Sequence, residues 1–503
     1  MEASFDYVVV GGGTAGSIVA ARLAEDRDVS VALLEAGPSD EGDERILEIG
    51  NWWRLAGSEL DHRFSIEPQE RGNTRLEHSR LRVLGGCSSH NQAIAFPAPT
   101  SDLERWEALG AAGWGPDACR PYFERVLGRV HVEAVRPDNA CAAAFVEAAQ
   151  QAGFPLLSFA DRNPREGVGW LRLNVRGRLR QSSSVAYLHP VARLASNLRV
   201  LTETTALRVL VDEGSQGSRA VGVETTHGSL GARREVIVSC GALDSPKLLL
   251  LSGIGPAQDL RLLGIRVAVP LLGVGRHLID HPEGTVIWEA SRPVPTGFVQ
   301  DWETALFART DPVTSEPDLM IHFGTMPASA DFAPPGAPTA EEAFWMTPNV
   351  TRPRSEGSLR LRSADPADAP LIDPRYYTDP EGHDERVMLA GMKLARRLAE
   401  QTALRAWVKL ELVPGPDVRD DGALSEHARL SGGTVHHPAG TCRLGGPNDP
   451  LAVVDPELRV RGVAGLRVAD ASVFPAMIGV NICLTCMMVG ERCADLVRAT
   501  ARA

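Results

Sequence analysis

The stretch that decides the fold is Phe5-Asp-Tyr-Val-Val-Val-Gly-Gly-Gly-Thr-Ala-Gly16, which runs on to Ala24 and is followed by Val29-Ser-Val-Ala-Leu-Leu-Glu-Ala-Gly37. It reads as a strand, a tight turn, a helix and a second strand. The apolar, β-branched run at residues 7–10 is typical of a buried parallel strand. Glycines follow it in G-x-G-x-x-G register, where a helix must begin. The stretch therefore predicts a βαβ unit in an α/β fold.

Each glycine of this turn has its own expected role. Gly11 permits the sharp turn, Gly13 lets the backbone approach a pyrophosphate, and Gly16 lets the helix and the strand pack closely. The N–H groups at the start of the helix, around Thr14 and Ala15, can bind the phosphates. A glycine-rich turn that binds no ligand is the alternative.

An acidic residue stands at the expected distance from the turn. Glu35 ends the second strand about twenty residues after the glycines, where a carboxylate can accept hydrogen bonds from an adenosine ribose. A phosphate on that ribose would be repelled, and we place the adjacent Ala36 in the same site. Strand, glycines, helix and carboxylate together predict a dinucleotide site. They do not separate FAD from NAD, because both contain an adenosine diphosphate half.

Length and composition limit the class of protein. The chain has 503 residues, of which 44% are hydrophobic and 23% are charged, and its net charge is −12. This length is enough for two or three units with their own cores. The negative charge argues against non-specific binding to nucleic acid or to anionic membranes, and it favours a cationic substrate.

Targeting and cysteine patterns point to the cytoplasm. We see no basic leader or cleavage site before the first strand, and the longest apolar stretches are interrupted by glycine or polar residues. We therefore expect no export signal and no membrane-spanning helix. The eight scattered cysteines do not form a disulfide pattern. Cys483 and Cys486 form a C-x-x-C pair in an apolar run, and we interpret both as core residues, so no metal is predicted.

Two later segments have the same character as the opening one. Leu84-Gly-Gly-Cys-Ser-Ser-His-Asn-Gln92 places small residues where a flat ligand could approach, although a simple loop is the alternative. Residues 235–256 repeat an apolar strand, a small-residue crossover and a helix, which indicates that the dinucleotide domain resumes there. Between residues 289 and 430 the composition changes, which indicates an inserted second domain.

Five motifs occur in one order along the chain: the glycines of residues 11–16, Gly85-Gly-Cys-Ser-Ser-His-Asn91, residues 241–256, Gly275-Arg-His-Leu-Ile-Asp-His281 and His436-His-Pro-Ala-Gly-Thr441. Through them the chain resembles the glucose–methanol–choline (GMC) flavin oxidoreductases over nearly its whole length. The resemblance is strongest to the choline oxidase-like branch, chiefly through the turn at residues 86–91.

The resemblance implies FAD and a two-domain α/β architecture. We expect a Rossmann-like FAD-binding domain built from discontinuous segments, at residues 1–155, 193–290 and 432–503. A smaller α+β substrate domain with an antiparallel sheet is expected at residues 156–192 and 291–431.

The resemblance also assigns roles to single residues. His437 corresponds to the active-site histidine, and Asn481 to its partner across the substrate oxygen. His90 falls on the position that carries a covalent histidyl–flavin bond in choline oxidase-like members, so we expect FAD to be attached there. The chemistry agrees, because alcohol oxidation by hydride transfer needs a group that takes the hydroxyl proton. The remaining cofactor residues are expected to be Gly85, Ser89, Asn91, Asp470 and Ala471.

The substrate pocket combines matches with departures. Trp52 and Glu303 are similar to the tryptophan and the carboxylate that surround a trimethylammonium head, and Val435 to an apolar residue that assists oxygen access near the flavin. A solvated carboxylate is the alternative for Glu303, and an ordinary strand residue for Val435. Gln92 and His436 stand where choline oxidase-like proteins carry a serine and a cage tyrosine. We therefore rank a choline-like or other amino alcohol slightly ahead of an uncharged primary alcohol.

These expectations converge on one reaction. We predict FAD-dependent oxidation of a primary alcohol, in which the hydroxyl proton moves toward His437, hydride passes to the flavin, and dioxygen reoxidises the flavin to give hydrogen peroxide. The alternatives are a dehydrogenase that uses a quinone or another acceptor, and a flavoprotein lyase on the same fold. The expected partners are the small alcohol and its electron acceptor, and a homodimer is left open.

Overall fold

The computed structural model describes residues 3–73, 75–160, 163, 165–215, 217–325 and 336–502. Its opening elements are β1 (Ala3–Val10), α1 (Gly16–Leu23) and β2 (Val31–Leu34), in the order predicted. β1 is parallel to β2 on one side and to β13 (Gly228–Val238) on the other. The last four residues of β1 are buried, which is why the strand is apolar without alternation.

The first sheet collects strands from three distant parts of the chain. Its order is β10 (Leu198–Leu201), β2, β1, β13, β12 (Gly217–Thr225) and β11 (Ala206–Gly214). The C-terminal strand β27 (Leu466–Val468) pairs in parallel with β13, and β26 (Val463–Ala464) pairs with β12. The predicted Rossmann-like domain of discontinuous segments is therefore confirmed.

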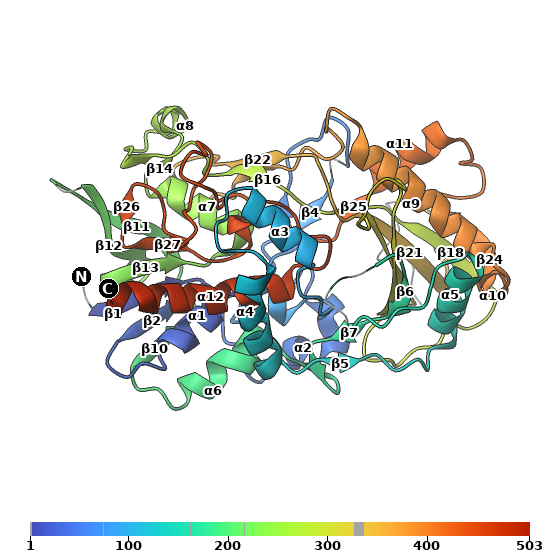
Figure 1. Ribbon diagram of the computed structural model, residues 1–503, viewed down its shortest axis with the longest axis horizontal. Coiled ribbons are helices and arrows are strands. Elements are labelled where there is room, and N and C mark those ends of the chain that lie inside the picture. The colour runs from blue at the N-terminus through green and yellow to red at the C-terminus, as the bar shows by residue number, and fades with distance from the viewer. Residues whose placement is uncertain are drawn as a thin grey trace.

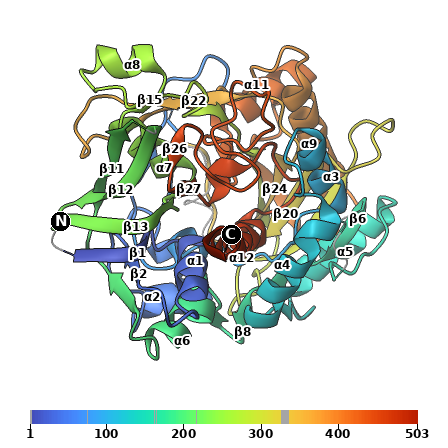
Figure 2. The same cartoon turned by 60° about the vertical axis from the view of Figure 1, so that its left-hand side comes forward.

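Helices cover this sheet and link it to the rest of the molecule. α7 (Gly241–Leu251) follows β13, and the last helix, α12 (Cys483–Arg502), packs against α1 and against α4 (Pro116–Arg129). α3 (Thr100–Ala108) packs on α4. Figure 2 looks along α12, which lies between the first sheet and α4. In Figure 1, α12 runs from the C-terminus at the left to the middle of the molecule, so the segment that precedes α12 lies near the middle.

The second sheet occupies the other end of the long axis (Figure 1). Its order is β24 (Val408–Val413), β18 (Val286–Ala290), β21 (Ala343–Val350), β20 (Leu319–Gly324), β19 (Trp302–Ala308) and β6 (Gly167–Trp170), all antiparallel. β17 (Pro282–Glu283) and β25 (Gly433–Thr434) pair beside β21. α5 (Ala140–Gln151) and α9 (His383–Ala399) pack against the strands. The expected antiparallel sheet is thereby confirmed.

Strand pairing and helix packing cross the expected domain borders at three places. β18 lies in the second sheet, although residues 193–290 were expected in the FAD-binding domain. α5 also packs on the second sheet, where Phe145 stacks on Phe323 with ring centroids 4.7 Å apart. Conversely, residues 184–192 pack against α1 and β10. The division into domains stays a prediction, and these borders differ because composition does not tell which sheet a strand will join.

Shorter elements complete the described chain: α2 (Glu44–Leu47), η1 (Ile49–Arg54), β3 (Phe64–Ser65), β4 (Glu77–His78), η2 (Gly86–Ser89), β5 (Glu133–Ala134), β7 (Arg172–Leu173), β8 (Val175–Arg176), β9 (Leu179–Arg180), η3 (Ser184–Leu188), α6 (His189–Ala192), β14 (Ile254–Gly255), α8 (Ala257–Leu262), β15 (Val269–Pro270), β16 (Arg276–Leu278), β22 (Gly357–Arg360), β23 (Leu371–Asp373), α10 (Thr402–Arg405), α11 (Asp421–Ser431) and η4 (Ala471–Val473). Among helices of the described residues, none has the length and apolarity needed to cross a membrane.

Candidate active site

The turn between β1 and α1 is held by close backbone contacts. Gly11 has a φ of +96°, a conformation that favours glycine, and a Cβ on Gly16 would lie 1.9 Å from the carbonyl oxygen of Gly11. The N-cap residue of α1, Ala15, provides no side-chain hydrogen bond to the helix. The N–H groups near Thr14 and Ala15 are therefore not capped by that side chain. This geometry suits a phosphate group bound by backbone, and it fits the FAD-binding role expected for the turn.

Glu35 lies at the end of β2, beside this turn. One carboxylate oxygen accepts a hydrogen bond from the Gly12 N–H at 2.9 Å, and the other accepts from the Gly37 N–H at 2.8 Å. Burial raises the pKa of Glu35 to about 7, although the two backbone N–H groups act in the opposite direction. Each oxygen still has a lone pair for a ribose hydroxyl. The carboxyl group thus occupies the expected place, next to the half-buried Ala36.

The second glycine turn is bonded to the first. The N–H of Gly85 donates to the Gly12 carbonyl at 2.7 Å, and a Cβ on Gly86 would lie 2.8 Å from Cα of Gly13. Gly85 has a φ of +81°, and its own Cβ would lie 2.2 Å from Oγ of Ser89. The two turns therefore form one wall of small residues, as a flat cofactor would need.

His90 ends this second turn and has an unpaired ring nitrogen. Its Nε2 lies 3.4 Å from Oγ of Ser79, whereas its buried Nδ1 has no hydrogen-bond partner among the described residues. The next residue, Asn91, is held by the buried Arg180, whose Nη1 donates to the Asn91 carbonyl and to Oδ1 at 3.2 Å. Gln92 follows as a partly exposed side chain. A free ring nitrogen fits the expected bond to FAD.

Asp470 accepts hydrogen bonds from three groups of the protein. Its Oδ2 accepts from the Gly241 N–H at 2.9 Å and from Oγ of Ser245 at 2.5 Å, and its Oδ1 accepts from the Ser472 N–H at 2.8 Å. The side chain therefore joins the end of β27 to the start of α7. Its neighbour Ala471 is buried, and its carbonyl accepts from the Gly440 N–H at 3.1 Å.

His437 is held by two adjacent residues from a distant part of the chain. Its backbone N–H donates to Oδ1 of Asp280 at 2.9 Å, and its Nδ1 lies 2.9 Å from Nδ1 of His281. Oδ2 of Asp280 accepts from the Tyr376 hydroxyl at 2.5 Å and from the Thr434 hydroxyl. The backbone and the ring of His437 are thus both fixed.

The environment keeps His437 neutral. Burial lowers its pKa well below the ordinary value, and the positive charge of Arg80 lowers it further. A neutral imidazole at pH 7 can accept a proton, as a general base must. No hydrogen bond to its Nε2 occurs among the described residues.

Asn481 lies just before α12. Its side chain interacts with the ring of His322, whose pKa burial lowers to about 4. Oδ1 of Asn481 is buried and makes no hydrogen bond of ordinary distance and angle with the described residues. The carbonyl of Ile478, three residues earlier, lies 3.1 Å from Nε2 of His281. One segment therefore contacts the neighbours of His437 and carries Asn481.

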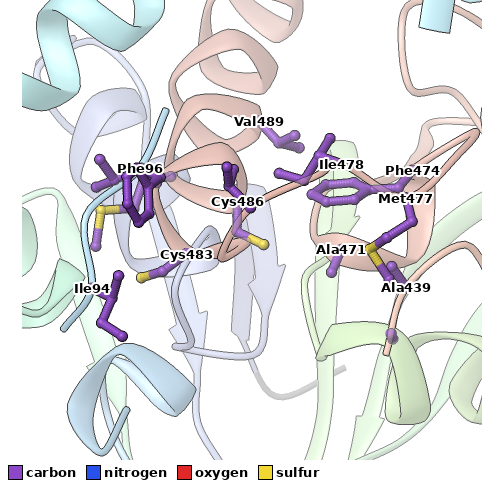
Figure 3. Close-up of a cluster of buried hydrophobic side chains, with 14 of the residues drawn as sticks. Ile94, Phe96, Ala439, Ala471, Phe474, Met477, Ile478, Cys483, Cys486 and Val489 are labelled. Carbon is purple, nitrogen blue, oxygen red and sulfur yellow. The ribbon is translucent and has the colours of Figure 1, made fainter. Parts of the chain in front are cut away.

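An apolar cluster supports this segment (Figure 3). Cys483 and Cys486 project from the first turn of α12, and both are buried free cysteines. Within the described residues, no group of three or more His, Cys, Asp or Glu side chains is placed to hold a metal ion. The other side chains labelled in Figure 3 are apolar as well: Ile94, Phe96, Ala439, Ala471, Phe474, Met477, Ile478 and Val489.

Trp52 and Glu303 have different partners. Nε1 of Trp52 donates to Oδ2 of Asp301 at 3.3 Å, and its ring packs edge-on to Trp302 with centroids 5.5 Å apart. The Glu303 carboxyl is buried and interacts with Asn139 at the start of α5, and its Oε2 has no partner among the described residues. Burial raises the pKa of Glu303 to about 7 and that of Asp301 to about 6. Two carboxyl groups, rather than the one expected, flank Trp302.

His436 presents a neutral ring in a strained conformation. Its φ is +60°, its N–H donates to the Thr434 hydroxyl at 2.9 Å, and its carbonyl accepts from Nη2 of Arg80 at 2.5 Å. Solvent reaches the ring, yet the surrounding protein and the Arg80 charge lower its pKa to about 3. It would therefore not repel a cation at pH 7. The partly exposed Val435 precedes it, and its N–H donates to the His281 carbonyl at 3.1 Å.

Sequence reasoning assigned no role to several of these neighbours. Asp280 and His281 end the quoted motif at residues 275–281, so an Asp-His pair in that motif was the available signal. Asp301 stands two residues before Glu303 and could have been considered with it. Arg80 and His322 lie in no motif, and their places follow only from the fold.

Comparison with known proteins shows which family the chain belongs to. Residues 5–283 and 353–490 match the family models of the N-terminal and C-terminal parts of the GMC oxidoreductases. The chain is 46% identical over 522 aligned residues to choline oxidase of Arthrobacter globiformis, covering 99% of this chain and 95% of that protein. It is 36% identical to the mitochondrial choline dehydrogenase of Homo sapiens, covering 98% and 90%. Its fold matches pyridoxine 4-oxidase from Mesorbium loti with a TM-score of 0.88, 29% identity and 99% coverage of both chains.

The glycine turns and Glu35 fit FAD, and the neutral His437 fits a group that takes a proton from an alcohol. Together with matches that span nearly the whole sequence, they show that this chain belongs to the GMC oxidoreductase family and is an FAD-dependent enzyme that oxidises alcohols.

Proposed function

We propose that the protein oxidises a choline-like primary amino alcohol, with dioxygen as the electron acceptor and His437 as the residue that takes the hydroxyl proton. FAD, held by the turns at residues 11–16 and 85–91 and by Glu35, supplies the hydride acceptor when it is bound. The unpaired, buried Oε2 of Glu303 is the observation that carries the preference for a cation.

The proton transfer follows from the state of His437. A neutral ring with a free Nε2 can accept the hydroxyl proton as the carbon–hydrogen bond breaks, and Asp280 keeps the backbone in place meanwhile. The Asn481 side chain can donate an amide hydrogen bond to the same oxygen without adding a charge. Both residues act on the oxygen of the substrate.

The proposal that the substrate has a cationic head rests on a group of aromatic rings and carboxyl groups. The rings of Trp52 and Trp302 pack together, and the ring centroids of Trp302 and Trp345 are 5.7 Å apart. A cation over such rings gains about 0.5–2 kcal/mol. A buried carboxyl with an unpaired oxygen is costly when ionised, and a facing cation removes part of that cost. Asp301 and Glu303 therefore favour a positively charged substrate.

Two departures favour a second candidate, an uncharged primary alcohol. Gln92 is larger than the serine of choline oxidase-like proteins and would narrow the pocket. His436 replaces a cage tyrosine and offers a smaller ring. We rank the cation first because the ring of His436 is neutral and because two carboxyls stand near Trp302.

We further propose that FAD is bound covalently through His90, whose buried Nδ1 has no hydrogen-bond partner among the described residues.

As the electron acceptor, we prefer dioxygen over a quinone because the relative at 46% identity is named an oxidase. The eight cysteines are free, which supports a reducing compartment such as the cytoplasm.

Anaerobic titration of the purified holoenzyme tests this proposal. We expect choline to bleach the flavin at lower concentration than 3,3-dimethylbutan-1-ol, its neutral isostere. Admission of air should then restore the colour and release one hydrogen peroxide per flavin. Bleaching by the isostere alone would reject the cationic substrate, and failure of air to restore the colour would favour a dehydrogenase.

A further inference from the structure

His281 has a hydrogen-bonding pattern that leaves only one arrangement of its protons. Its Nε2 lies 3.0 Å from the carbonyl oxygen of Thr351 and 3.1 Å from that of Ile478. Carbonyl oxygens only accept hydrogen bonds, so Nε2 must carry a hydrogen. The side chain is 1% exposed, and burial lowers its pKa to about 4. At neutral pH its Nδ1 therefore holds a lone pair and no proton.

The same Nδ1 lies 2.9 Å from Nδ1 of His437. Two lone pairs would repel each other at this distance, so the hydrogen between the rings must belong to His437. We infer that His281 is a positioning residue that holds His437 as its Nδ1–H tautomer, with the lone pair on Nε2. This inference rests on the proposed role of His437 only for its catalytic consequence.

The surroundings make this arrangement rigid. Thr351 follows β21 and Ile478 precedes α12, so the acceptors of His281 come from two distant segments. The rings of His281 and His437 are nearly perpendicular, at 78° with centroids 5.1 Å apart. Asp280 fixes the backbone of His437 from the adjacent position. His437 therefore has little freedom to rotate and offer Nδ1 to a substrate.

The bond between the two rings decides which nitrogen of His437 can act as the base. Because Nδ1 of His437 donates its hydrogen to His281, the lone pair is on Nε2, and Nε2 is the ring nitrogen that can take the hydroxyl proton. After that transfer, the positively charged ring still donates its Nδ1–H to His281, now as a stronger, charge-assisted bond. The positioning residue thus supports both the neutral and the protonated form.

Nitrogen NMR on holoenzyme labelled with 15N-histidine tests the inference without turnover. The His437 signals are identified as those that disappear in His437→Gln. We expect wild-type His437 to show a protonated Nδ1 and an unprotonated Nε2. In His281→Leu, which lacks the acceptor, we expect the proton to move to Nε2. In His281→Asn, whose side-chain oxygen can take the place of the acceptor, the wild-type pattern should return.

Flavin reduction by substrate adds a second readout. A wrong tautomer in a histidine-based catalytic group can lower the rate by about 10⁴-fold, so we expect a fall of about 10²-fold or more in His281→Leu. His281→Asn should recover most of it, and His131→Leu, which removes an exposed histidine outside the site, should react normally. A protonated Nε2 in the wild type, or an unchanged pattern in a folded His281→Leu, would overturn the inference. A moved proton with an unchanged reduction rate would support it and reject His437 as the base.

Discussion

Replacing Glu303 with glutamine should weaken the binding of a cationic alcohol and leave its neutral isostere unaffected. Oε2 of Glu303 is buried and unpaired, so the substitution removes a charge without breaking an ion pair in the described chain. Two opposite charges about 5 Å apart interact by roughly 3 kcal/mol at an effective dielectric constant near 20. Desolvation of the cation offsets part of this. We therefore expect a loss of about 10–100-fold in affinity for choline.

The pH dependence of choline binding is a second test, because the pKa of Glu303 determines whether the affinity rises or falls with pH. Burial raises the pKa of Glu303 to about 7, so the carboxyl is mostly neutral at pH 6 and mostly charged at pH 8.5. Choline affinity in the wild type should rise across this interval, because a charged carboxylate attracts the cation. The contribution of Glu303 to that rise should disappear in Glu303→Gln. The neutral isostere should bind equally to both proteins at both pH values.

The assay is anaerobic flavin reduction at varied substrate concentration, with choline and 3,3-dimethylbutan-1-ol measured side by side. Glu289→Gln is the matched control, because Glu289 lies on β18 of the same sheet and pairs with Lys409 at 2.7 Å. A wild type that prefers the isostere, or a preference that Glu303→Gln leaves unaltered, would show that Glu303 does not recognise the substrate.

Other substitutions test the remaining parts of the site. His437→Ala should slow flavin reduction by about 10²–10⁴-fold, the usual contribution of a positioned acid–base group, and unchanged reduction kinetics in protein that retains its flavin would refute that role. Asn481→Ala should cost about 2–13-fold, the equivalent of one net hydrogen bond. Acid precipitation of the wild type should leave the yellow colour with the protein, whereas His90→Ala should release it; colour released from the wild type would mean that no covalent bond exists. Gly16→Ala should be purified with little flavin, because its Cβ would lie 1.9 Å from the Gly11 carbonyl, and full occupancy would contradict that packing.

The first sheet could be predicted from the sequence because its signals are local. The strand, glycine turn, helix and Glu35 stand within about forty residues, and each has a stereochemical requirement that few residue types meet. Likewise, an apolar run at residues 7–10 predicts burial on both faces of a strand, as β1 has. Local requirements of this kind do not depend on the rest of the fold.

Pairings between distant segments could not be predicted in the same way. β18 joins the second sheet through β21 and β24, and nothing in its own five residues indicates those partners. His281 and His437 are 156 positions apart, and their contact depends on the loops that bring them together. Trp52 and Glu303 were expected to surround the same cationic head, and the hydrogen bond from Trp52 to Asp301 adds a second carboxyl two positions before Glu303. Asp301 comes just before β19, and its contact with Trp52 follows from the fold rather than from a local motif.

Rapid anaerobic mixing of the oxidised enzyme with choline, and with choline deuterated at the carbinol carbon, addresses the proposed reaction most directly. Hydride transfer to bound FAD predicts that choline bleaches the flavin in a single turnover and that deuterium slows this bleaching. Enzyme with stoichiometric FAD that choline does not bleach would contradict the proposed amino-alcohol substrate. Bleaching at the same rate with deuterated choline would mean that cleavage of the carbon–hydrogen bond does not limit flavin reduction, which would contradict the predicted slowing.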